Sequence, residues 1–157
     1  MARYYEADDT AYRIMEDLID DRFGGLRAAN IKILIDAKPK IDKLTKRMTF
    51  ASIKCANEIE RFFTRTGQNL AGVDYIIFLS ELVWELANDN DKKRILSHEL
   101  RHAFIDDKGN YKTIKHDIED FYAEIELNKD DPMWAQALST ISIAKYDQLK
   151  AEEKANR

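Results

Sequence analysis

The sequence predicts an α+β fold, in which a small β-sheet packs with several helices. Two short runs rich in β-branched residues, 31–36 and 73–79, have the composition and length of strands. Much of the remaining chain has apolar residues at helical spacing, and no repeat or Pro/Gly-rich linker divides it. The chain has 157 residues, of which 45% are hydrophobic, so we expect one core and a single domain over residues 1–157.

Charge and cysteine content narrow the classes of function. The formal net charge is -4 at pH 7, which gives no general attraction to nucleic acid or anionic lipid, so neither is an expected partner. Cys55 is the only cysteine, which excludes an internal disulfide and a cysteine-based zinc site and fits a reducing compartment. The acidic first residues lack the pattern of a signal peptide, and no apolar run is long enough to cross a membrane. We therefore expect a soluble, cytoplasmic protein.

In the first half of the chain we expect a helix, a strand and a segment that contains both. The capping residues 8–10 precede the helix, and Gly24-Gly25 ends it. Its apolar residues recur at helical spacing, and they are Ala11, Met15, Leu18 and Ile19. The run 31–36 is a strand that ends before Pro39. Residues 48–63 divide into a strand, followed by a helix.

The second half begins with the run 73–79, which is short and apolar and therefore predicts a mostly buried strand. A short helix follows from Ser80 or Glu81. The polar cluster 88–91 ends that helix and offers a cap for the next one, which we expect to run from about Lys92 to Phe104.

Two further helices are expected after a polar turn at residues 106–110. The first begins at His116 with acidic residues in its first turn, and its apolar stripe consists of Ile118, Phe121, Tyr122 and Ile125. The last begins at Asp131-Pro132 and has apolar residues along one side, namely Trp134, Leu138, Ile141 and Leu149. We expect residues 150–157 to be a flexible tail.

The sequence His98-Glu99-Leu100-Arg101-His102 lies within the helix expected over residues 92–104. His98 and His102 are four residues apart, so their side chains project from one helical face and can bind the same metal ion. Glu99 adjoins the first histidine and can reach a water molecule at an open position of that ion. Zinc lowers the pKa of its bound water to about 7, so Glu99 can act as the general base. This pattern predicts a catalytic zinc site.

A catalytic zinc ion usually has three protein ligands and one open position. His116 is the only other histidine, and the turn at residues 106–110 lets the chain double back, so we rank it first as the third ligand. Carboxylates also serve as the third ligand in some zinc sites. Glu119, Asp120 and Glu124 therefore remain acidic alternatives.

Other polar residues give weaker signals. Asp106 or Asp107 is a candidate to orient a histidine ligand, although acidic residues in loops are more often simply solvated. Tyr111 or Tyr122 is a candidate to stabilise an oxyanion, although packing is the commoner role of a tyrosine. We expect the remaining candidates to be packing residues, and they are Cys55, Trp84 and Trp134.

Four segments of the chain can be compared with known protein families. They are Val73-Asp74-Tyr75-Ile76-Ile77-Phe78, Val83-Trp84, the histidine motif and His116-Asp117-Ile118-Glu119-Asp120-Phe121. Together they resemble the putative phage metallopeptidase family over roughly residues 26–128. The resemblance implies a compact zincin-like fold, a zinc cofactor and a phage or prophage origin, and therefore the cytoplasm of a bacterial host. It also supports His116 as the third ligand.

Our first hypothesis is a zinc-dependent metallopeptidase that hydrolyses a peptide bond in a protein or peptide substrate. Zinc is held by His98, His102 and His116, and Glu99 is the general base. Such a substrate could lie as an extra strand along a sheet edge. The alternative is a phage-derived, zinc-containing binding or regulatory protein without significant peptidase activity. A metal-free helical interaction protein is a third hypothesis, but it leaves the three histidines unexplained.

Overall fold

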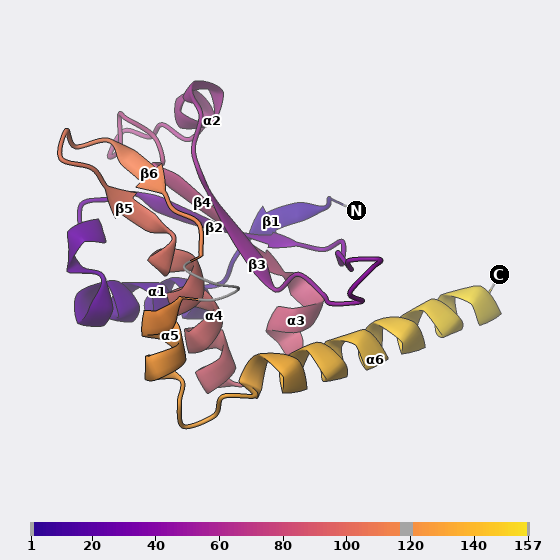
Figure 1. Ribbon diagram of the computed structural model, residues 1–157. Helices are drawn as coiled ribbons and strands as arrows, with labels where there is room; N and C mark the ends of the chain where they lie inside the picture. The colour runs from indigo at the N-terminus through magenta and orange to yellow at the C-terminus, as the bar shows by residue number, and fades with distance from the viewer. Residues whose placement is uncertain (1, 117–120, 157) are drawn as a thin grey trace.

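The computed structural model describes residues 2–116 and 121–156, and it confirms the predicted α+β class (Figure 1). The strands of the described chain are β1 (Tyr4–Glu6), β2 (Ile31–Asp36), β3 (Ala51–Cys55), β4 (Tyr75–Ser80), β5 (Ala103–Ile105) and β6 (Tyr111–Thr113). Its α-helices are α1 (Asp9–Arg22), α2 (Glu58–Phe63), α3 (Glu81–Leu86), α4 (Asp89–Arg101), α5 (Tyr122–Leu127) and α6 (Trp134–Ala155). A short 3-10 helix, η1, covers Gly24–Leu26.

The main sheet has four strands in the order β1-β2-β4-β3. The two central strands, β2 and β4, are parallel, with Ile33 opposite Ile77, and both of these side chains are fully buried. The outer strands β1 and β3 run antiparallel to their neighbours. The strands predicted at residues 31–36 and 73–79 are therefore the central pair, which agrees with their apolar sequences. The edge strand β1 has only three residues, too few for the sequence pattern to reveal it.

Helices α1 and α4 contribute to the core that covers one face of the sheet (Figure 1). Helix α1 begins where the Asp8 side chain accepts the backbone N–H of Ala11, and its apolar stripe is buried as predicted. Helix α4 begins in the same way, because the Asn88 side chain accepts the N–H of Asp91. Each cap satisfies a backbone donor that the first helical turn leaves unpaired.

Helix α4 ends earlier than predicted, and the prediction of a helix up to Phe104 was wrong. The chain leaves the helix at His102, and β5 then pairs with β6 in a hairpin. The hydroxyl of Tyr75 on β4 donates to the carbonyl oxygens of Phe104 and Lys112, at 2.8 Å and 2.9 Å, which attaches both hairpin strands to the main sheet. Gly109, with a φ of 80°, closes the turn between them.

The helix predicted to begin at His116 does not begin there, because residues 114–116 have no helical structure and α5 starts at Tyr122. Ile118 lies outside the described residues, as does the side chain of Tyr122. The predicted apolar stripe is only partly correct. Phe121 is buried, but Ile125 is 46% exposed and the neighbouring Glu124 is buried in its place. The reason is an ion pair to α4, which sets the rotation of this short helix.

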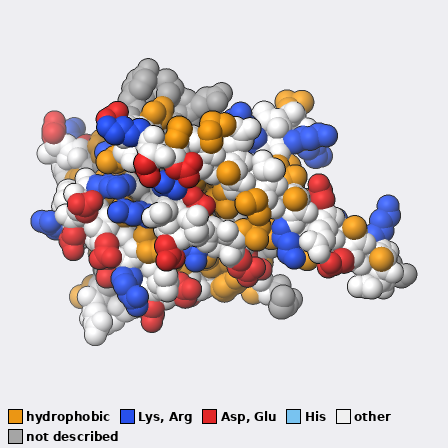
Figure 2. Space-filling view, turned by 90° about the horizontal axis from the view of Figure 1, so that it is seen from below, with side chains coloured by type: hydrophobic (Ala, Val, Ile, Leu, Met, Phe, Trp, Pro, Cys, Tyr) orange, Lys and Arg blue, Asp and Glu red, His pale blue; other side chains and the backbone are white. Residues whose placement is uncertain are grey.

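Helix α6 begins at Trp134, close to the predicted start, and runs to Ala155, so the expected tail is helical over most of its length. Its first half packs on the core through Leu138, whereas Ile141 and Leu149 are exposed, contrary to the prediction of one apolar side. Its second half extends beyond the rest of the molecule (Figure 1). Figure 2 shows acidic and basic side chains interspersed over the face seen from below. No helix in the described ranges is long and apolar enough to span a membrane.

Candidate metal centre

Helix α4 holds the sequence His98-Glu99-Leu100-Arg101-His102 in a fixed position because its apolar face is buried. The core residues on that face are Ile95, Leu96 and Leu100. Arg22 of α1 donates to the hydroxyl of Ser97 at 3.0 Å, which adds a polar link next to the first histidine. His98 and His102 themselves are only half-buried, so their rings reach the surface of the molecule.

The structure brings His116 to the two histidines of α4. One ligand nitrogen from each of the three residues lies within 4.8 Å of the others. The Nε2 atoms of His98 and His116 are 2.7 Å apart. The ring centroids of His102 and His116 are separated by 4.4 Å. Three imidazoles from two separate segments therefore converge at one point.

The ring of His102 is oriented by a backbone group. Its Nδ1 lies 2.6 Å from the carbonyl oxygen of Ile114, and because a carbonyl only accepts hydrogen bonds, Nδ1 must be the protonated nitrogen. The Nε2 atom of His102 therefore has its lone pair available to a metal ion. The N–H of Ile114 also donates to the carbonyl of His102 at 2.7 Å, so the two residues are joined twice.

No sequence pattern points to this role of Ile114, since any residue can supply a carbonyl oxygen. Asp106, which we considered for the same role, instead accepts the N–H groups of Lys108 and Asn110 within the hairpin turn. These hydrogen bonds lower the pKa of Asp106 below its ordinary value. Asp107 is exposed in the same turn.

The three histidines are a suitable donor set for zinc. Neutral imidazole nitrogens are among the ligands that zinc prefers, at bond lengths of about 2.0–2.1 Å. Nitrogens within 4.8 Å of one another can reach one ion after small rotations of their side chains. If all three bound one zinc ion, a fourth tetrahedral position would remain for water or substrate, as in catalytic zinc sites.

Glu99 lies beside this cluster in a different environment. Its side chain is 7% exposed, and burial raises its pKa to about 8. The cause is desolvation, which disfavours the charged form of a carboxyl group. Such a pKa near neutrality is typical of groups that exchange protons in a reaction.

An open cavity of about 640 Å³ joins the histidines, Glu99 and the edge strand β3. On one side it is lined by Ala51, Ser52 and Ile53 of β3, and on the other by residues 113–116. Because β3 is the last strand of the sheet, one side of its backbone has no partner strand among the described residues. The cavity therefore places candidate ligands, a candidate base and free backbone groups next to one another.

Phe121 packs against the three histidines, whereas Glu124 pairs with Arg101. The ring of Phe121 is 1% exposed, and its centroid lies 4.9–5.5 Å from the centroids of all three imidazoles. Glu124, one of the acidic alternatives for the third ligand, instead accepts hydrogen bonds from Arg101. The other two alternatives, Glu119 and Asp120, lie outside the described residues.

The remaining candidates of the sequence analysis have packing roles. Tyr111 packs edge-on against Tyr75 at a centroid distance of 5.6 Å and does not line the cavity. Cys55 is half-buried, and its thiol donates to the carbonyl of Tyr111 at 3.5 Å. Trp84 is buried in the core, and Trp134 packs against its edge.

Comparison with known proteins adds one finding. A profile of the family described as "Putative phage metallopeptidase" matches residues 2–142. This range is wider than residues 26–128, starts before β1 and ends within α6. No curated protein and no solved structure matches the chain. The family description implies a metal ion and a protein or peptide substrate.

Proposed function

This chain belongs to the putative phage metallopeptidase family, and from that premise we propose that it is a zinc-dependent peptidase. In this proposal the imidazoles of His98, His102 and His116 bind one zinc ion, and Glu99 is the general base. The observation that supports it most directly is the convergence of three histidine nitrogens within 4.8 Å beside a buried carboxyl group.

When bound, zinc supplies Lewis acidity, which polarises a carbonyl group and lowers the pKa of water to about 7. The histidines fix the position of the ion, and the hydrogen bond from His102 to Ile114 keeps one ligand nitrogen directed at it. The three imidazoles would be neutral as ligands, so they would not reduce the positive charge of a bound ion.

Glu99 transfers the proton. Its carboxylate takes a proton from the attacking water and gives it to the nitrogen of the leaving amine, so that the peptide bond breaks without a free amide anion. Burial raises the pKa of this carboxyl to about 8 in the metal-free site, and the positive charge of a bound ion nearby would lower it again. Glu99 would then be ionised near neutral pH, as a general base must be.

The substrate is an extended polypeptide that binds along β3. The outer edge of β3, which has no partner strand in the described part of the chain, lines the cavity beside the histidines. Backbone N–H and C=O groups at such an edge can pair with an added strand. Pairing of this kind recognises the main chain and leaves side-chain preference to the cavity walls.

The test is to replace Glu99 by Gln and to measure both zinc content and cleavage of a denatured protein and of a fluorogenic peptide library. We expect Glu99→Gln to retain zinc and to lose about 10²–10⁴-fold in cleavage rate, because a positioned general base contributes that much. Glu85→Gln, on the exposed surface of α3, is the matched control and should cleave at the wild-type rate.

Equal cleavage by wild type and Glu99→Gln would contradict the assigned role of Glu99. A wild-type chain that binds zinc but cleaves neither probe would favour the binding or regulatory alternative instead.

A further inference from the structure

The third histidine differs from His98 and His102 in the secondary structure that holds it in place. His116 is exposed and has no helix or strand of its own, because it follows β6 and precedes α5. A ligand on such a segment binds metal tightly only if the segment is already held in the right place, since ordering it during binding costs conformational entropy. The contacts of the described residues on either side of it, 114–116 and 121–124, therefore determine how well His116 can act.

Described residues before and after His116 are attached to the end of α4. Before it, the backbone and ring of His102 bond to Ile114, at 2.7 Å and 2.6 Å. After it, Arg101 donates from Nη2 and Nε to Oε2 of Glu124, at 2.8 Å and 3.2 Å. Arg101, the last residue of α4, and His102, its C-cap, thus contact the chain on both sides of His116.

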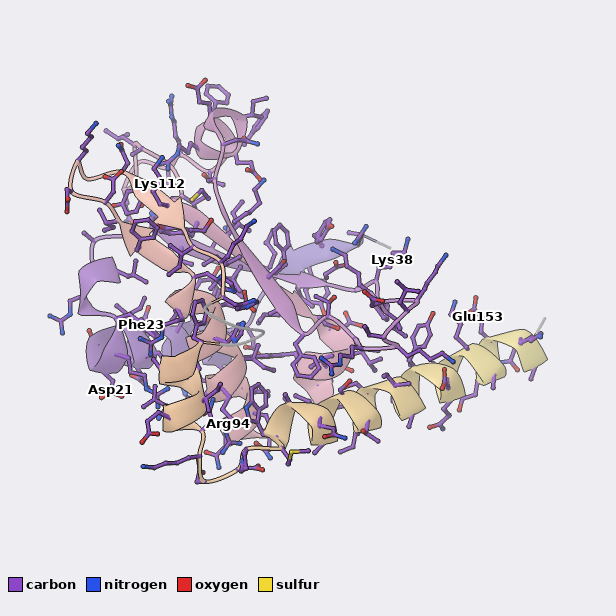
Figure 3. The ribbon with its side chains drawn as sticks, in the orientation of Figure 1. Asp21, Phe23, Lys38, Arg94, Lys112 and Glu153 are labelled. Atoms are coloured by element: carbon purple, nitrogen blue, oxygen red, sulfur yellow. The ribbon has the colours of Figure 1, made fainter. Side chains whose placement is uncertain are left out.

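The ion pair between Arg101 and Glu124 is more buried than an ion pair on the protein surface. Glu124 is 1% exposed, and the Arg101 guanidinium also lies over the ring of Phe23, labelled in Figure 3, at 4.6 Å from its centroid. Oε1 of Glu124 has no hydrogen-bond partner among the described residues, so Arg101 is the group that compensates the burial of this carboxylate. Separating the two groups would leave the carboxylate buried without a compensating charge, which is costly, so the pair opposes movement of α5 away from α4.

Phe121 transmits this position to the metal site. It is the N-cap residue of α5, the helix that contains Glu124, and its buried ring contacts His98, His102 and His116. Any movement of α5 away from Arg101 would therefore move a ring that packs against all three imidazoles.

We propose that Arg101 and Glu124 form a positioning pair that holds α5 against α4 and thereby presets His116 for metal binding. This inference rests on the proposed metal site, but it concerns affinity and does not require peptidase activity. Neither residue lines the cavity beside the histidines. Their effect is exerted through Phe121, whose ring packs against His116.

A double-mutant cycle with zinc as the probe tests the pair. Glu124→Gln keeps the shape of the side chain but removes its charge, and zinc affinity is measured in the full chain by competition with a chromogenic chelator. We expect Glu124→Gln to weaken zinc binding about tenfold in the wild-type background, the lower end for supporting residues of metal ligands. In a His116→Ala background the same substitution should change affinity less than twofold, because the ligand that it positions is gone.

Two further variants separate the positioning role from a general loss of structure. Glu126→Gln is the same substitution on the same helix, at a carboxylate 73% exposed and paired with Lys129, and it should leave zinc affinity unchanged. Arg101→Lys keeps the charge but loses the two-point contact, so it should show a smaller loss that again depends on His116. If Glu124→Gln does not fold, Arg101→Lys takes its place in the double-mutant cycle.

A loss of equal size in the wild-type and His116→Ala backgrounds would overturn the positioning role while leaving the metal site intact. Failure of the folded wild-type chain to bind zinc would overturn the proposed function and the positioning role together.

Discussion

Helix α4 and the chain that follows it, as described over residues 103–116, both contribute to the candidate site, yet they are held in different ways. The helix has a continuous apolar face in the core, where Leu96 is 0% exposed. The following hairpin is shorter and more open, with Phe104 37% exposed, and hydrogen bonds from Tyr75 add to the partial burial of its other apolar side chains. The histidine pair is thus fixed by a fully packed helix, whereas the third histidine depends on partly buried contacts, polar contacts and the ring of Phe121. Affinity for metal should be most sensitive to changes in the second region, and stability to changes in the first.

The largest effect expected from this comparison is on stability. Leu96→Ala should lower the free energy of unfolding by about 3–5 kcal/mol, because it leaves a cavity in a fully packed core. Phe104→Ala should cost about 1 kcal/mol or less, since much of that side chain already contacts water. Urea denaturation of the metal-free proteins measures both. Similar losses for the two variants would show that the hairpin is as firmly packed as the helix.

A smaller effect is expected in the pH dependence of metal-free stability. Burial raises the pKa of Glu99 from 4.5 to about 8, so between these values the unfolded chain ionises this carboxyl while the folded chain keeps it protonated. The folded state therefore loses stability as pH rises through this range. Glu99→Gln cannot ionise, so near pH 8 it should be more stable than wild type by on the order of 1–3 kcal/mol.

Below about pH 4 the advantage of Glu99→Gln should disappear, because the carboxyl is then protonated in both states. Thermal unfolding of the two proteins across this pH range gives the measurement. A difference that does not change with pH would mean that burial does not perturb Glu99.

The same comparison explains what could be predicted from sequence. Spacing along one helix depends only on local geometry, so His98, Glu99 and His102 could be assigned to one site without a structure. The hairpin was missed because its strands have three residues each, which is too short for an alternating pattern. The contacts on either side of the third histidine come from a backbone carbonyl, which bonds to the ring of His102, and from an ion pair between distant residues. Neither leaves a local signal in the sequence.

Helix α5 shows how an ion pair between distant residues can defeat a prediction made from the local sequence pattern. Its apolar pattern predicted that Ile125 would face the core, but Glu124 is buried instead because Arg101 supplies a partner for it. Sequence patterns assume that charged residues are outside, and a buried ion pair reverses that assumption. The structure places His116 beside the pair, whereas its rank as third ligand rested on its being the only other histidine and stays a prediction.

Zinc titration of the full chain, together with His98→Ala and His116→Ala, tests the central claim most directly. We expect one zinc ion per wild-type chain and a loss of about a hundredfold or more in affinity for each variant, because each ligand contributes roughly a quarter of a binding free energy of about 10–16 kcal/mol. A wild-type chain that stays metal-free with zinc in excess, or variants that bind zinc as tightly as wild type, would contradict the three-histidine site.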